Sequence, residues 1–131
     1  MAQMPASVAK GFTRVVSTAD GASAFEDADL NLTEQRIADG ASPMFVGDLG
    51  SAPGVAYVRL TDFAEPHPAA APQWVVMLRG VIEVEVSDGT CRRFGPGDLV
   101  FAADTTGRGH ITRTVGEGPF EALGIVSASA G

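Results

Sequence analysis

The chain has 131 residues, of which 45% are hydrophobic, so it can form one packed domain but is too short for two. Its 16 acidic residues outnumber the 9 basic ones, and the resulting net charge of −7 argues against a nucleic-acid-binding surface. The single cysteine, Cys91, excludes an intrachain disulfide, and no apolar run is long enough for a membrane span. We therefore expect a soluble cytoplasmic protein without a signal peptide.

The N-terminal segment, residues 1–32, is expected to form an arm that packs on the rest of the domain or on a partner subunit. Such an arm would cover exposed strand edges. The best helical candidate of the chain, residues 32–41, is brief and ends in a glycine turn, so it gives no convincing helix. Residues 33–131 are expected to form the domain itself.

Beyond residue 42, short strand-like runs alternate with turn residues. In residues 81–86, Ile82, Val84 and Val86 share one face, while the two glutamates between them lie on the other. Residues 73–80 are apolar on both faces, as in a strand that is covered on both sides. Turn signals recur about every 8–12 residues, which predicts an all-β sandwich or barrel. The predicted strands are residues 42–49, 55–63, 73–80, 81–86, 91–103, 110–115 and 120–128.

The only two histidines of the chain, His67 and His110, each lie in a distinctive short segment. His67 opens the stretch HPAAAPQ, which ends at Gln73, and an extended backbone would place these two side chains on one face. His110 follows the turn-rich stretch DTTGRG and opens a predicted strand, in which Thr112 lies on the same side. The question for function is whether the two histidines meet.

These two segments resemble the two motifs of the cupin superfamily, a family of small jelly-roll β-barrels. The first family motif runs His-x-His and then Glu, and His67, Ala69 and Gln73 occupy those places here. The second motif is Gly-Asp, a short strand and a later His, and residues 97–102 match its first half before a longer loop leads to His110. The resemblance covers about half of the chain. It implies a single-domain, cupin-like jelly-roll β-barrel that forms a homodimer.

In the cupin frame, His67, Gln73 and His110 would converge inside the mouth of the barrel, where small barrels bind one small ligand. One hypothesis is a metal-dependent, dioxygenase-like enzyme in which these three residues bind one divalent ion (Fe, Ni, Cu or Zn). The family site usually has three histidines and one glutamate, whereas Ala69 cannot bind a metal and Gln73 is neutral. Asp104 is a candidate for a further ligand, unless it is simply an exposed loop residue.

The hypothesis that we favour needs no metal. His67 and His110 act as general acid and base, and Gln73 holds a substrate carbonyl or hydroxyl group. Such a site suits an isomerase, cyclase or lyase that acts on a carbonyl-containing, largely apolar small molecule, for example in natural-product biosynthesis. A third hypothesis is a module that binds a small ligand without catalysis.

Five further residues are candidates for contact with a substrate, and one of them is Thr112, on the His110 side of its predicted strand. Tyr57 and Arg59 share a face of their predicted strand, and if that face points inward they could donate a proton and bind an enolate or carboxylate; otherwise Arg59 points to solvent. Met77 and Phe101 are predicted to lie in the core or to line the pocket. Trp74 follows Gln73 directly, so we expect it on the opposite face, in packing contacts.

Overall fold

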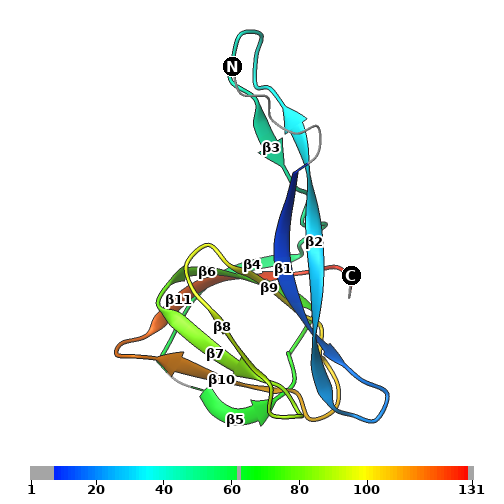
Figure 1. The fold of residues 1–131 in the computed structure, drawn as a ribbon, viewed down its shortest axis with the longest axis vertical. Coiled ribbons are helices and arrows are strands. Elements are labelled where there is room, and N and C mark those ends of the chain that lie inside the picture. Colours follow the sequence, from blue (N-terminus) through cyan, green and yellow to red (C-terminus); the bar gives the residue numbers. More distant parts are fainter. Residues whose placement is uncertain (1–7, 62, 130–131) are drawn as a thin grey trace.

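The computed structural model describes residues 8–61 and 63–129. Within them there are eleven strands and no helix, which confirms the predicted all-β class. No helix long and apolar enough to cross a membrane occurs in these described ranges. The strands (Figure 1) are β1 (Val8–Ser17), β2 (Ser23–Gln35), β3 (Met44–Val46), β4 (Gly54–Leu60), β5 (Phe63–His67), β6 (Gln73–Arg79), β7 (Val81–Glu85), β8 (Cys91–Phe94), β9 (Leu99–Ala102), β10 (His110–Val115) and β11 (Phe120–Val126).

The strands form two sheets. The larger sheet has seven strands in the order β3-β2-β1-β9-β6-β11-β4, and the smaller has four in the order β5-β10-β7-β8. All pairings are antiparallel except that of β1 with β9, which is parallel. The two sheets are not closed into a barrel, so the architecture in the described residues is that of two layers with a hydrophobic interior.

The N-terminal segment is part of the larger sheet. β1 and β2 form a long hairpin, with register from Val8 opposite Leu32 to Ser17 opposite Ser23, and β1 also pairs with β9. The boundary that we expected at residue 32 therefore falls inside β2. The helical candidate at residues 32–41 begins in this strand, because pairing with β1 and β3 overrides a weak local preference. Residues 1–7 of the expected arm lie outside the described residues.

The hydrophobic core lies between the two sheets. Ile82, Val84 and Val86 are buried, as their alternation predicts, while Glu83 and Glu85 remain partly exposed on the other face. These side chains pack in one cluster with residues from the larger sheet: Val15, Met77, Val100, Phe120 and Ala122. At one end of this interior the packing opens into the cavity described below.

The outer face of the larger sheet carries a second group of packed side chains. The ring of Trp74 lies 4.8 Å from that of Phe12 and 4.9 Å from that of Phe101, in edge-to-face arrangements. The indole N–H of Trp74 donates a hydrogen bond of 3.0 Å to the backbone carbonyl of Leu49, in the segment that follows β3. Trp74 is thus buried in packing, as predicted, and faces away from the interior between the sheets.

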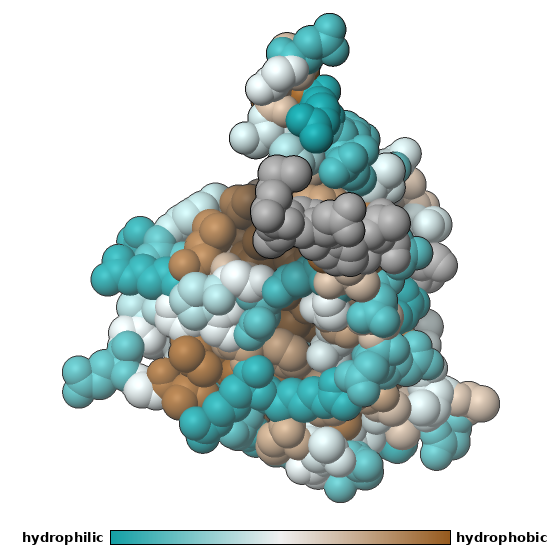
Figure 2. Space-filling view, turned by 45° about the horizontal axis from the view of Figure 1, so that its top comes forward, coloured by the Kyte–Doolittle hydropathy of each residue, from teal (hydrophilic) through white to brown (hydrophobic). Residues whose placement is uncertain are grey.

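The surface differs between the projecting hairpin and the rest of the molecule. β2 and β3 extend beyond the two packed sheets (Figure 1), and this projecting part is mainly hydrophilic in the view of Figure 2. On the same face, hydrophobic side chains of the two-layered part form separate patches between hydrophilic ones (Figure 2). Scattered apolar patches of this kind are ordinary for a protein surface.

Candidate functional site

A cavity of about 300 Å³ lies between the two sheets. Most of its wall is apolar, and it includes Val58, Leu60, Val75, Ile82, Ala102 and Phe120. Four polar side chains join this wall: His67, Gln73, His110 and Thr112. No Asp, Glu, Lys or Arg is among the described residues that line it. An apolar cavity with a few polar groups is the usual form of a small-molecule site.

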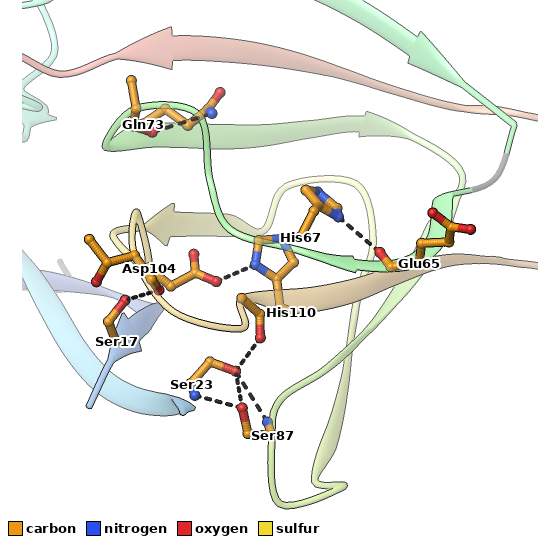
Figure 3. A network of polar contacts seen from close by, with 11 residues as sticks. Ser17, Ser23, Glu65, His67, Gln73, Ser87, Asp104 and His110 are labelled. Atoms are coloured by element: carbon orange, nitrogen blue, oxygen red, sulfur yellow. Dashed lines mark hydrogen bonds and ion pairs between the residues drawn. The ribbon is translucent and has the colours of Figure 1, made fainter. Parts of the chain in front are cut away.

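The two histidines meet at one side of this cavity (Figure 3). β5 and β10 run antiparallel with His67 opposite His110, and the two ring centroids lie 4.8 Å apart at an interplanar angle of 52°. Gly109 makes this approach possible. Its φ is +72°, and a Cβ atom there would lie only 2.0 Å from the carbonyl oxygen of His67, so a side chain would collide with the neighbouring strand.

The side chain of Asp104 contacts the imidazole ring of His110. Its Oδ2 lies 2.5 Å from Nδ1 of His110, and the Asp104 side chain is completely buried. A carboxylate only accepts hydrogen bonds, so Nδ1 of His110 carries the proton of this bond and Nε2 carries the lone pair of the neutral ring. Oδ1 of Asp104 has no hydrogen-bond partner in the described part of the chain. The alternative that Asp104 is an exposed loop residue is therefore wrong.

The loop that delivers His110 is anchored on the N-terminal hairpin. The backbone N–H of Ala103 donates to the carbonyl of Val15 at 2.8 Å, and that of Arg108 donates to the carbonyl of Gly21 at 2.9 Å. The buried hydroxyl of Ser23 donates to the carbonyl of Gly109 at 2.7 Å. β1 and β2 thus fix the position of a histidine that lies 75 residues after the end of β2 at Gln35.

His67 is held differently. Its Nδ1 lies 3.1 Å from the backbone carbonyl oxygen of Glu65 (Figure 3). A carbonyl oxygen can only accept, so this contact places a proton on Nδ1 of His67 as well. Neutral His67 then presents its lone pair at Nε2, and the protonated ring presents an N–H there.

Gln73 lies on β6, in the opposite sheet, and reaches the cavity from there (Figure 3). Its side-chain amide donates a long hydrogen bond of 3.4 Å to the carbonyl of Ala71, and its oxygen lies beside Gly124. His67, Gln73 and His110 therefore line one cavity. The two histidine rings contact each other, whereas Gln73 lies apart from them in the opposite sheet. Gln73 faces the space in which a ligand would lie.

The donor set does not fit a resident divalent metal. His67 and His110 supply two imidazoles and Gln73 a neutral amide, while the carboxylate of Asp104 is bound to the Nδ1 atom of His110. Within the described residues there is no group of three or more His, Cys, Asp or Glu side chains that could hold an ion. Without an anionic ligand, the charge of such an ion would be poorly compensated.

Of the remaining predicted site residues, some line the cavity and others lie outside it. Thr112 lines the cavity, on the same face of β10 as His110. Tyr57 and Arg59 do not, because Val58 and Leu60 occupy the inward face of β4 and leave their neighbours exposed on the other. The guanidinium group of Arg59 instead lies 3.5 Å from the carboxylate of Glu121.

Met77 and Phe101 belong to packed regions rather than to the cavity wall. Met77 is 1% exposed in the core between the sheets, and Phe101 is 2% exposed on the outer face beside Trp74. The only sequence signal for the role of Asp104 is its place six residues before His110. The apolar lining from β4 could have been found from the alternation of Val58 and Leu60.

No protein-family model matches the chain, and no curated protein matches it. Membership of the cupin superfamily therefore stays a prediction that rests on the two histidine segments.

Proposed function

We propose that this protein is a cupin-like enzyme of the isomerase, cyclase or lyase type, in which His67 and His110 are the general acid and base. The observation that carries the proposal is the contact of the two imidazole rings, 4.8 Å apart, at the wall of a largely apolar cavity. Histidine suits both roles because both of its protonation states are accessible near neutral pH.

The chemistry is assigned to the Nε2 atoms of the two rings, since Nδ1 faces Glu65 in His67 and Asp104 in His110. The Nε2 lone pair of one histidine takes a proton from the carbon next to a substrate carbonyl, and the electron pair of the C–H bond forms a C=C bond. The carbonyl oxygen then takes a proton from Nε2–H of the other histidine, which yields an enol. Return of a proton to another position gives an isomer, and attack or expulsion by the enol gives cyclisation or elimination.

The composition of the cavity wall indicates the class of substrate. A neutral molecule with a carbonyl group and an apolar body matches the wall, because no described lining residue offers a Lys or Arg side chain to a carboxylate or phosphate group. Gln73 and Thr112 supply hydrogen bonds that orient the polar end of such a molecule.

Proton exchange is the direct test. The protein is incubated in D₂O with enolisable ketones such as 2-tetralone and 1-phenylpropan-2-one, and loss of the α-proton signal is followed by ¹H NMR. We expect exchange above the buffer rate, and a decrease of roughly 100-fold or more in His67→Gln and in His110→Gln. Tyr57→Phe, outside the cavity, is the matched control and keeps the wild-type rate.

Two results would contradict the proposal. Binding of these ketones without any exchange would identify a non-catalytic ligand-binding module. Loss of exchange after treatment with a chelator, with recovery on addition of one divalent metal, would identify a metal-dependent enzyme instead.

A further inference from the structure

We propose that Asp104 is the positioning residue of this site: it holds His110 in the tautomer with the proton on Nδ1, and thereby makes Nε2 of His110 the proton acceptor. The tautomer itself follows from the geometry of the pair. The assignment of His110 as the base, and of His67 as the acid, rests on the proposed function.

The first argument is the contact between the two side chains. The distance of 2.5 Å from Oδ2 of Asp104 to Nδ1 of His110 is below the usual range of about 2.7–2.9 Å for a charge-assisted N–H···O hydrogen bond, so the two groups are in direct contact. The Asp104 side chain is 0% exposed and that of His110 is 11% exposed, so water does not compete for this bond. A bond that is shielded in this way fixes both the tautomer and the orientation of the imidazole ring.

The second argument is the position of the Asp104 backbone. Its carbonyl oxygen accepts a hydrogen bond of 3.0 Å from the N–H of Ala69, two residues after His67. One residue therefore holds both halves of the pair: its side chain contacts His110, and its main chain is bonded to the segment that carries His67. Movement of Asp104 would change the separation of the two rings.

The third argument is the carboxylate oxygen that is left without a partner. Oδ1 of Asp104 is buried and makes no hydrogen bond with any described residue. An apolar side chain of similar shape would avoid this cost, so the carboxylate is not explained by packing. A role in charge compensation explains it.

The chemical consequence concerns the step in which a proton leaves the substrate. The C–H bond breaks, its electron pair stays with the substrate, and the proton forms a bond to Nε2 of His110. The ring then carries a positive charge, and the carboxylate at its Nδ1 compensates that charge without any rearrangement of the site. His67 donates the proton that the substrate oxygen takes.

The tautomer can be read without a substrate. Long-range ¹H–¹⁵N correlation spectra of the ¹⁵N-labelled protein distinguish a protonated from an unprotonated nitrogen in each of the two histidine rings. We expect neutral wild-type His110 to carry its proton on Nδ1. A proton on Nε2 instead would mean that a protonated Asp104 donates to Nδ1, and this result would overturn the proposal, as would a doubly protonated His110 ring at neutral pH.

The variant Asp104→Leu separates positioning from packing, because leucine has a similar shape and removes the acceptor. We expect a cooperatively folded protein, a shift of His110 towards the Nε2–H tautomer, and a decrease of roughly 100-fold or more in ketone exchange. Asp98→Leu is the control. It removes a carboxylate that accepts a hydrogen bond of 2.8 Å from the N–H of Gly95, and it leaves the His110 tautomer unchanged.

The two proposals can fail separately. Wild-type His110 with the Nδ1–H tautomer in a protein that exchanges no ketone would refute the proposed function and support the positioning role of Asp104. Ketone exchange that depends on both histidines, but persists at the wild-type rate in Asp104→Leu, would refute the positioning role alone.

Discussion

Replacement of Gly109 by alanine tests how closely the two histidine strands must approach. Gly109 precedes His110 and lies against the backbone of His67 on the neighbouring strand. A Cβ atom at Gly109 would lie 2.0 Å from the carbonyl oxygen of His67, whereas real Cβ contacts essentially never fall below 3.0 Å. The strands would have to separate by about 1 Å, and the histidine rings would move apart with them.

The magnitude has two parts. A left-handed φ of +72° costs a non-glycine residue about 1–2 kcal/mol. Forcing extra volume into a tight contact costs about another 1–3 kcal/mol. Gly89, in the turn between β7 and β8, has a φ of +87°, and a Cβ atom there would meet nothing within 4 Å, so Gly89→Ala carries only the first part. We therefore expect Gly109→Ala to be about 2 kcal/mol less stable than Gly89→Ala.

Urea denaturation of both variants and of the wild type, followed by tryptophan fluorescence, measures this difference in the free energy of unfolding. The ketone exchange test measures its effect on the site, and only Gly109→Ala should lose activity. Equal stability of the two variants, within about 0.5 kcal/mol, would refute the close approach of β5 and β10 that underlies the histidine contact.

Three further predictions concern residues outside the histidine pair. Met77→Ala should lower the free energy of unfolding by about 2–5 kcal/mol, because Met77 is 1% exposed in the core. The His110 tautomer should stay as in the wild type. A small loss of stability would contradict the core position of Met77. Arg59→Ala should change stability by less than about 1 kcal/mol and leave ketone exchange intact, since the Arg59 side chain is 63% exposed and Glu121 keeps its second ion pair, with Arg79. Desolvation and the carboxylates of Glu83 and Glu85 raise the pKa of the Cys91 thiol. Alkylation of Cys91 by iodoacetamide should therefore begin at higher pH than alkylation of free cysteine. Glu83→Gln should move the onset of this alkylation to lower pH.

In this fold, local sequence patterns predict which side chains of a strand are buried, but they do not predict which strands pair. Local periodicity predicts the alternation of Ile82, Val84 and Val86, and the structure confirms that these three residues are buried. The tight turn at Gly80 also suggests a hairpin of β6 and β7, but this prediction is wrong, because β6 lies in the larger sheet and β7 in the smaller one. The role of the N-terminal segment cannot be predicted in this way, because the parallel pairing of β1 with β9 joins residues far apart in sequence. Nothing in the local pattern of β1 identifies that partner.

The candidate site, too, can be predicted only in part from local sequence patterns. The two short motifs identify His67 and His110 as a pair, and the structure places their rings in contact. In β4, the apolar Val58 and Leu60 alternate with Tyr57 and Arg59, so the sequence already favours Val58 and Leu60 for the inward face, and Tyr57 and Arg59 lie on the other face. The contact of Asp104 with His110 depends on the path of the intervening loop, which is set by hydrogen bonds to β1 and to the turn before β2.

The pairing of β1 with β9 also has a consequence for the nascent chain. β1 is synthesised well before β9, so their parallel pairing and the Val15 contact to Ala103 form only after residues 99–103 have been synthesised. The β1–β2 hairpin must therefore wait, with one edge unpaired, until most of the domain has emerged. Refolding should be slow for a chain of this length, and the histidine site should be among the last parts to assemble.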